Sequence, residues 1–301
     1  MKILSFIKSN GILCLGMVML LFLLIVTFFG EHLPGIDTKL EEIEYLWMDK
    51  IPTVPPFEPS DEFLLGTDRL GRDILSLIVI GAKETLLIIL SITIIRYLLA
   101  IPLAYFAHKN WLGANAVLNW LNGFLSYIPT IIVVILLVTL PPILETEARP
   151  FFVVLIIASI EIGRVAEMVK IEYNQISTKE FVKGGNAVGI TNTRLLKNYY
   201  MPFLYGKILV SLVGDLGKVM FLLGQLGFLG IFVSQDFIQV DPGVFEFQNT
   251  SISWPMLLLN AFNDIRGPVW IPFFPALAMT YVILTFNILA QGLQKFAKSR
   301  I

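Results

Sequence analysis

The residue types that most often carry out catalysis or hold metal ions are scarce and scattered in this sequence. The chain of 301 residues contains two histidines, His32 and His108, and one cysteine, Cys14. They are too few for a structural zinc site, a haem site or an internal disulfide. The sequence also lacks a G-x-x-x-x-G-K-[ST] phosphate loop, an H-E-x-x-H zinc motif and a G-x-S-x-G nucleophile motif. We therefore expect no catalytic residues, no directly bound metal or cofactor, and no ATP hydrolysis by this chain.

Charged residues inside long apolar runs are the more informative signal. Arg96, Asp215 and Lys218 lie in such runs, where a charged side chain is costly unless it is paired or faces a polar cavity. Asp215 and Lys218 are three positions apart, so they lie on one face of a helix and can neutralise each other. Two interpretations stay open: a buried ion pair that lets helices pack, or a polar lining to a path through the membrane.

The apolar run around Asp215 is also rich in glycine, and small residues allow helices to approach closely in a membrane. A packing role is the simpler interpretation, and a moving wall of a passage is the alternative. The glycines concerned are Gly206, Gly214, Gly217, Gly224, Gly227 and Gly230.

Composition places these residues in an integral membrane protein with an all-α fold. Hydrophobic residues make up 56% and charged residues 15% of the chain, and the mean hydropathy is +0.76, unlike a soluble domain. The net charge of -1 argues against nucleic-acid binding. Six runs are interpreted as membrane spans: residues 11–29, 85–107, 116–140, 151–170, 203–231 and 270–293.

The weakest of these spans is the fourth, because Glu161 and Arg164 interrupt it. The first run is longer than the apolar region of a signal peptide, so we expect a retained anchor. We detect no second domain in residues 1–301. The remaining segments are two outer loops, 30–84 and 232–269, and a polar segment, 171–202.

The distribution of charge predicts the orientation of the chain. Both termini and segment 171–202 carry an excess of Lys and Arg, whereas loops 30–84 and 232–269 carry most of the acidic residues. Because cytoplasmic segments are enriched in Lys and Arg, we expect both termini and segment 171–202 to be cytoplasmic.

The polar segment is predicted to form two short helices joined at a corner. Ser177 and Glu180 are spaced as a capping box, which predicts a helix start at Ser177. Gly189 is expected to end this helix. A second helix is predicted to begin at Thr191, and Pro202 is expected either to interrupt it or to open the next helix.

Several segments together resemble a known family of membrane proteins. EFVKGGNAVGITNTRLLKNYYMPF, from Glu180, is similar to the cytoplasmic signature of bacterial ATP-binding-cassette importer permeases. GTDRLGRD at 66–73, GFLG at 227–230, Ser253-Trp254 and the run WIPFFPALAMTYVILTFNILAQGL resemble the dipeptide, oligopeptide and nickel permeases, specifically their second, C-type subunit. The similar segments extend from about residue 60 to the C-terminus.

This resemblance implies a type I importer permease fold with six membrane helices, located in the bacterial cytoplasmic membrane in contact with lipid. It implies a heterodimer with a second permease subunit, two ATPases that use ATP, and an extracytoplasmic substrate-binding protein. In that family the signature segment forms the coupling helix, which docks on an ATPase. The positions that correspond here are Glu180, Phe181, Val182, Lys183, Gly184, Gly185 and Gly189.

One departure from the family pattern is visible in this helix. Lys183, Gly184 and Gly185 stand where the family usually has Glu-Ala-Ala. Each glycine inside a helix lowers stability by about 1 kcal/mol relative to alanine, so we expect a softer coupling helix. The departure marks either an altered fit to the ATPase or glycines that are tolerated because docking orders the helix.

Two outer segments receive structural interpretations. GTDRLGRD is predicted to be a turn hinged at Gly66 and Gly71, with four charged side chains pairing locally: Asp68, Arg69, Arg72 and Asp73. The aromatic residues of the last outer loop either contact the binding protein or form a solvated surface. They are Phe232, Phe237, Phe245, Phe247 and Trp254.

The function expected from the sequence is that of a permease subunit of an ATP-driven importer, with peptides favoured as substrates. Nickel or a nickel chelate is the alternative within the family, disfavoured because no cluster of His or Cys could coordinate the ion directly. A self-contained secondary transporter is the alternative from another class, and the absence of a detectable repeat argues against it.

Overall fold

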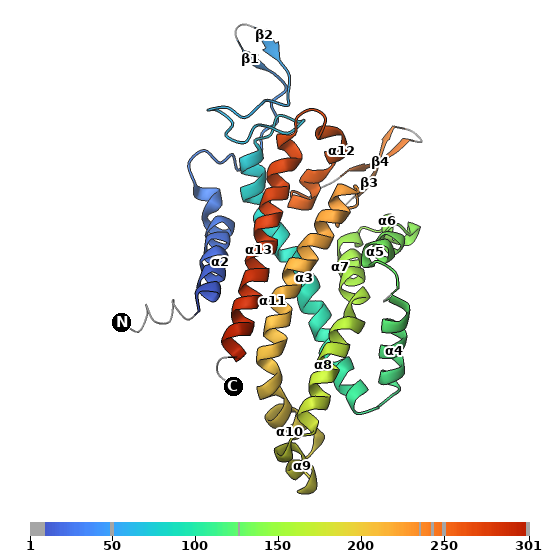
Figure 1. The fold of residues 1–301 in the computed structure, drawn as a ribbon. Coiled ribbons are helices and arrows are strands. Elements are labelled where there is room, and N and C mark those ends of the chain that lie inside the picture. The colour runs from blue at the N-terminus through green and yellow to red at the C-terminus, as the bar shows by residue number, and fades with distance from the viewer. Residues whose placement is uncertain are drawn as a thin grey trace, which may run out of the picture.

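The computed structural model describes residues 10–48, 51–125, 127–234, 236–241, 244–248 and 251–298. It is an elongated bundle of helices (Figure 1). Among the described residues, four helical stretches are long and apolar enough to cross a membrane: Gly11–His32, Ile74–His108, Asn192–Phe228 and Trp270–Lys298. The all-helical membrane fold predicted from composition is therefore confirmed.

The helix α3 (Ile74–His108) runs through the middle of the bundle (Figure 1). Its first turn is capped by Asp73, whose carboxylate accepts the backbone N–H of Ser76 at 2.8 Å. The helix begins well before the predicted span 85–107, so residues 74–84 are helical rather than part of a loop. With 35 residues it is about 52 Å long, and so extends beyond a hydrocarbon layer of about 30 Å.

The predicted third span is not one helix. It divides into α4 (Ala114–Leu125) and α5 (Thr130–Val138), with Pro129 at the N-cap of α5. Proline has no N–H to continue a helical hydrogen-bond ladder, which explains the break. The predicted span 116–140 is therefore interrupted and consists of two helices.

The predicted fourth span also contains an interruption. It corresponds to α7 (Arg149–Ile160) and α8 (Ile162–Ser177), which meet at Glu161 and follow the short α6 (Pro141–Leu144). The helix α5 packs on α7, and α4 and α3 pack on α8. These shorter helices form the side of the bundle furthest from α2 (Gly11–Phe29) (Figure 1).

Glycines set the closest helix contacts. The helix α11 (Met201–Phe228) packs along α13 (Trp270–Lys298), and α13 packs on α2. A Cβ atom on Gly224 would lie 2.9 Å from the Met279 side chain, and one on Gly227 would overlap the backbone of Pro255. The predicted packing role is thus confirmed at these two glycines, whereas Gly206 has open space around it.

The structure adds a glycine contact that the sequence pattern did not single out. A Cβ atom on Gly292 of α13 would lie 2.5 Å from the backbone of Leu13, and one on Gly16 of α2 would lie 2.8 Å from the backbone of Leu289. The two helices therefore touch backbone to backbone at two glycines, one on each helix.

The non-helical elements gather at one end of the bundle (Figure 1). Two antiparallel hairpins lie there, β1 with β2 and β3 with β4. The bounds of the strands are β1 (Leu46–Met48), β2 (Ile51–Thr53), β3 (Asp236–Asp241) and β4 (Val244–Gln248). Three further short helical elements are η1 (Gly30–His32), η3 (Trp254–Leu258) and α12 (Ala261–Asp264).

The GTDRLGRD turn lies at the same end and is partly as predicted. Gly66 and Gly71 have positive φ angles of 76° and 79°, and Arg72 pairs locally with Asp68 at 2.7 Å. The prediction for Arg69 is wrong, because its guanidinium pairs with Asp264, far away in sequence. Asp73 is a helix cap and not an ion-pair partner for its neighbours in the turn.

The aromatic residues of the last outer loop do not form one surface. Phe232 is 5% and Trp254 3% exposed, so both are core residues, and the Trp254 indole N–H donates to the Ile78 carbonyl at 2.8 Å. The predictions that these two contact a partner or face solvent are therefore wrong. The side chains of Phe237, Phe245 and Phe247 lie outside the described part of the structure.

Candidate functional site

The helix-turn-helix segment projects from the end of the bundle opposite the hairpins (Figure 1). Its first helix is α9 (Glu180–Ala187), with Lys179 at the N-cap and no side-chain cap. Ser177 belongs to the last turn of α8, where its hydroxyl donates to the Asn174 carbonyl at 2.6 Å. The predicted capping box is wrong, because Ser177 ends one helix instead of starting the next.

The end of α9 is as predicted. Gly189 has a φ of 78°, a conformation that L-residues rarely adopt. Its N–H donates to the Asn186 carbonyl at 3.0 Å, and the Ile190 N–H donates to the Gly185 carbonyl at 3.1 Å. This pair of bonds is a Schellman motif, which ends a helix and turns the chain sharply.

The second helix begins after Thr191, as predicted, and leads directly into the bundle. It consists of α10 (Asn192–Leu195) and a π-helical turn, η2 (Leu196–Tyr200), that continues into α11. Pro202 lies in the first turn of α11 and therefore opens the next helix. A π turn accommodates the hydrogen bond that proline cannot donate.

The two faces of α9 differ in exposure. Val182 and Gly185 are buried, and a Cβ atom on Gly185 would lie 3.2 Å from the Leu195 side chain. Gly185 therefore allows α9 to pack tightly on α10. On the outer face, a Cβ atom on Gly184 would meet nothing within 4 Å. The exposed residues that the sequence assigned to coupling are Glu180, Phe181, Lys183, Gly184 and Gly189.

An aromatic cluster supports α9 and α10 where they join the bundle. Tyr105 and His108 of α3, Tyr173 of α8 and Tyr200 of η2 lie with ring centroids 5.4 to 5.8 Å apart. Burial raises the pKa of the Tyr173 phenol, so that it stays neutral. The segment is thus held by apolar and aromatic packing rather than by its own short helices.

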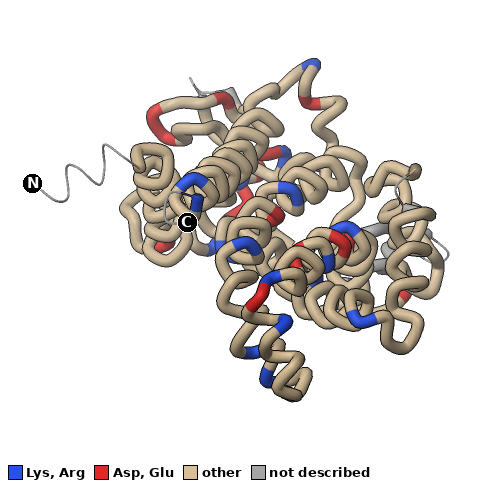
Figure 2. The backbone as a smooth tube through the Cα atoms, turned by 60° about the horizontal axis from the view of Figure 1, so that its bottom comes forward, with Lys and Arg blue, Asp and Glu red and all other residues tan. Residues whose placement is uncertain are grey.

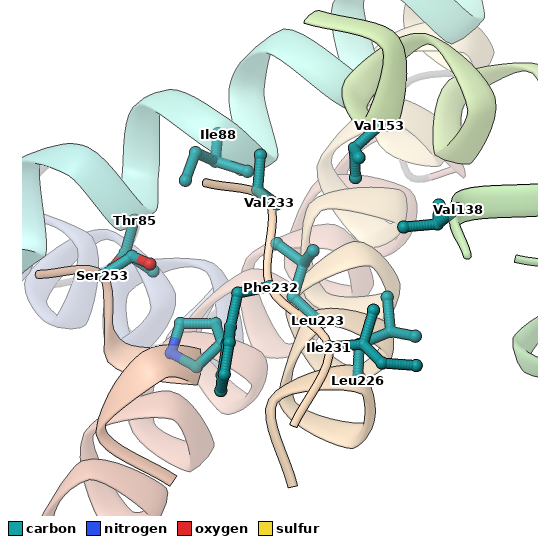
Figure 3. Close-up of a pocket in the computed structure, with 11 residues that line it drawn as sticks. Thr85, Ile88, Val138, Val153, Leu223, Leu226, Ile231, Phe232, Val233 and Ser253 are labelled. Atoms are coloured by element: carbon teal, nitrogen blue, oxygen red, sulfur yellow. The ribbon is translucent and has the colours of Figure 1, made fainter. Parts of the chain in front are cut away.

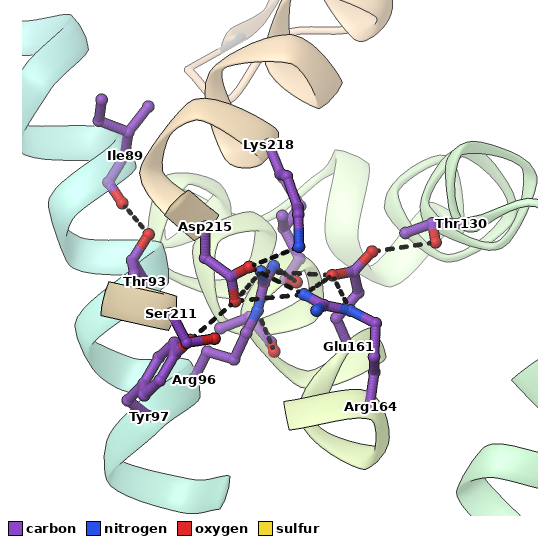
Figure 4. Close-up of polar contacts among 12 residues, drawn as sticks. Ile89, Thr93, Arg96, Tyr97, Thr130, Glu161, Arg164, Ser211, Asp215 and Lys218 are labelled. Atoms are coloured by element: carbon purple, nitrogen blue, oxygen red, sulfur yellow. Dashed lines mark hydrogen bonds and ion pairs between the residues drawn. The ribbon is translucent and has the colours of Figure 1, made fainter. Parts of the chain in front are cut away.

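A second candidate site is a cluster of charged side chains inside the bundle (Figure 4). Asp215 of α11 is fully buried, and its carboxylate forms ion pairs with Lys218 at 3.1 Å, Arg164 at 3.1 Å and Arg96 at 3.8 Å. The carboxylate of Glu161 forms ion pairs with Arg164 at 2.7 Å and Arg96 at 3.5 Å. We refer to these five residues as the charge cluster.

The sequence prediction identified only part of this cluster. The predicted Asp215–Lys218 pair is present, and the structure brings Arg96 to the same carboxylate. Glu161 and Arg164 were visible in the sequence as charges that weaken the fourth span, but nothing in the sequence linked them to Asp215. Their placement follows from the packing of α8 against α3 and α11.

Two open cavities meet at the charge cluster. One, of about 880 Å³, lies between α4 and α8 and is lined by Glu161 and Arg164. The other, of about 350 Å³, lies between the start of α5 and α11 and is lined by Arg96, Glu161 and Lys218. Glu161 and Thr130 line both, so the cluster forms a polar wall shared by the two spaces.

One other hollow of the described structure is too small for a substrate. An apolar cavity between α3, α7 and α11, near Thr85 and Ser253, has a volume of only about 10 Å³ (Figure 3), room for about one water molecule. Among the described residues no group of three or more His, Cys, Asp or Glu could hold a metal ion.

Comparison with known proteins gives matches along nearly the whole chain. It is 24% identical over 291 residues to the dipeptide transport system permease protein DppC of Bacillus subtilis (strain 168), covering 96% of this chain and 82% of that protein. It is 22% identical over 288 residues to the oligopeptide transport system permease protein OppC of the same organism, covering 95% and 85%. The chain is a homologue of C-type peptide-transport permeases.

A third match extends the relationship to another organism. This permease homologue is 24% identical over 262 residues to the di/tripeptide transport system permease protein DppC of Pseudomonas aeruginosa (strain UCBPP-PA14), covering 81% of this chain and 80% of that protein. No family model matches the chain. The resemblance inferred from the sequence motifs is confirmed, and the permease homologue is a multi-pass protein of the bacterial membrane.

Proposed function

We propose that the chain is one permease subunit of an ATP-driven importer of di- or oligopeptides. The observation that carries this proposal is the combination of chain-long similarity to peptide-transport permeases with a projecting helix-turn-helix whose outer face is exposed. In this proposal the chain forms half of the translocation path and performs no catalysis. Separate ATPase subunits hydrolyse ATP.

Six membrane crossings and cytoplasmic termini complete the proposal. The four long helical stretches supply four crossings, and α4 with α5 and α7 with α8 supply two interrupted ones. Helix interruptions are tolerated at membrane depth where they are buried in protein or line a cavity, and the two breaks border the cavities at the charge cluster.

The charge distribution supports this orientation. Lys and Arg residues appear on the end that carries α9 and near the end of α13 (Figure 2). With this end in the cytoplasm, the acidic segment 30–73 and the hairpins face outward, following the positive-inside rule. The outer end then meets the substrate-binding protein, and a second permease subunit completes the path.

The helix α9 is proposed to dock in a groove of an ATPase. Its outer face exposes Phe181, Lys183 and Gly184. The ring of Phe181 stacks on Phe203 with ring centroids 5.0 Å apart, which fixes its position. The two glycines of the Lys183-Gly184-Gly185 departure then have different roles. Gly185 allows close packing within the permease, and Gly184 lies where an ATPase side chain can approach the backbone closely.

Gly184→Trp tests the coupling role. The position is exposed and has nothing within 4 Å, so tryptophan leaves the permease folded but fills the space needed by the ATPase. We expect the membrane to contain normal amounts of the variant, while copurified ATPase and ATP-dependent peptide uptake fall at least tenfold. Gly267→Trp, at an open position near α12, is the matched control. Normal uptake by Gly184→Trp would contradict the proposal.

The alternatives make different predictions for the same preparation. A self-contained secondary transporter would take up peptides in liposomes without ATPases and would respond to an ion gradient. A nickel importer would take up Ni²⁺ in the presence of its binding protein and ATP, with no competition from peptides.

A further inference from the structure

The charge cluster is not electrically balanced. Three cations, Arg96, Arg164 and Lys218, meet two carboxylates, Glu161 and Asp215, and all the ion pairs found for these residues in the described structure are with each other. The cluster therefore carries a formal charge of about +1. In surroundings of low dielectric constant one uncompensated charge attracts an anion strongly.

The excess positive charge is on the accessible side of the cluster. The side chain of Lys218 is 58% exposed and that of Arg164 is 44% exposed, whereas Asp215 is 0% exposed. Lys218 lines one cavity and Arg164 the other. The balancing carboxylate thus lies behind the two cations, which present N–H donors to the open spaces.

The hydrogen-bond donors of Lys218 and Arg164 also favour an anionic ligand. The ammonium of Lys218 has three donors, and one of them is used by Asp215 at 3.1 Å. Arg164 donates to Glu161 through Nε and Nη2 and to Asp215 through Nη2, and its planar guanidinium is suited to carboxylate oxygens. Cavities of about 350 and 880 Å³ are in the size range that holds small ligands.

We propose that Lys218 and Arg164 form a binding site for the terminal carboxylate of a peptide in transit, a site that deepens and rests on the proposed import function. Glu161, which is 23% exposed and pairs with Arg164 and Arg96, lowers the positive potential of the site. Transport requires binding weak enough for the substrate to leave, and Glu161 supplies that weakening.

A chemical protection experiment tests the site directly in the assembled transporter. Lys218 is modified with an amine-reactive ester, and its modification rate is followed by peptide mass spectrometry. Millimolar N-acetyl-dialanine is expected to slow the modification at least threefold, whereas N-acetyl-dialanine amide, which lacks the carboxylate, leaves the rate unchanged. Lys207 lies on the same helix, is 53% exposed and pairs with Glu172 outside the cluster, so its rate should respond to neither compound.

Two variants separate recognition of charge from a structural role. Lys218→Gln should lower uptake of a free-acid dipeptide about tenfold, the loss of one charge-assisted hydrogen bond, and change uptake of the dipeptide amide less than twofold. Comparing the two substrates within each transporter cancels the preference of the binding protein. Glu161→Gln should strengthen the protection of Lys218 by N-acetyl-dialanine. A simple loss of structure would weaken that protection instead. Lys207→Gln is the matched control.

The outcomes distinguish this site from the import function. Equal protection by acid and amide, no protection, or an equal loss of uptake for both substrates in Lys218→Gln would overturn the carboxylate site while leaving ATP-driven uptake by the unaltered transporter intact. Selective protection without ATP-dependent uptake would overturn the import function and leave the carboxylate site standing.

Discussion

Alanine at Gly184 and alanine at Gly189 should change the stability of α9 in opposite directions. Both glycines are exposed, and a Cβ atom at either position would meet nothing within 4 Å. Gly184 has helical geometry, so Gly184→Ala should stabilise the helix by about 1 kcal/mol through backbone entropy alone. Gly189 has a φ of 78°, so Gly189→Ala should destabilise its end by about 1–2 kcal/mol.

Hydrogen–deuterium exchange of residues 180–190 in the assembled permease, measured in detergent without ATPases, reports these changes. A change of about 1 kcal/mol in local opening corresponds to roughly a fivefold change in exchange rate. We expect exchange about fivefold slower in Gly184→Ala and at least fivefold faster in Gly189→Ala. Unchanged or faster exchange in Gly184→Ala would refute the assignment of Gly184 as a softening residue free of contacts.

The same Gly184→Ala variant separates the two interpretations of the glycine. If Gly184 marks an altered fit to the ATPase, ATPase activity stimulated by the loaded binding protein falls although the helix is more stable. If docking itself orders the helix, activity stays equal to that of the parent protein. Gly189→Ala then provides the comparison in which stability and activity fall together.

Three further changes test the packing and the ion pairs. Gly292→Val should push α2 away from α13, because even a Cβ atom would lie 2.5 Å from the Leu13 backbone; the expected loss is about 1–3 kcal/mol, seen as a lower Tm in detergent. Arg69→Ala leaves Asp264, which is 1% exposed, without its ion-pair partner, so Tm should fall, and Asp264→Ala in addition should restore part of the loss in a double-mutant cycle. Asp215→Ala leaves buried cations uncompensated and should destabilise the fold by about 3–5 kcal/mol. Limited proteolysis measures this loss, and the variant should be cleaved faster than the parent protein.

Local sequence chemistry accounted for the features that depend on a few adjacent residues. The positive φ angles at Gly66, Gly71 and Gly189 follow from glycine being the residue that adopts them most easily. The Asp215–Lys218 pair follows from helical spacing. The capping box at Ser177 failed because two helices compete for the same residues, and α8 continues through Ser177 when it packs on α3.

The long outer segments were harder to predict because their contacts are remote in sequence. Arg69 pairs with Asp264 instead of a neighbour, and Trp254 is buried against α3 through its hydrogen bond to Ile78. Aromatic and charged residues in a loop have many local partners of similar energy, and the packing of the whole outer end selects among them.

The sequence by itself determined the membrane class, the long helices, the family relationship and the helix-turn-helix segment, because hydropathy, glycine geometry and short motifs act over a few turns. Only the tertiary structure decided the charge cluster and the cavities beside it. Arg96, Arg164 and Asp215 come from three separate helices, and Glu161 from the break between α7 and α8. Helical periodicity orients each side chain without specifying which helix it will face. That choice depends on the close packing of α3, α8 and α11, where buried charges are stable only when they meet.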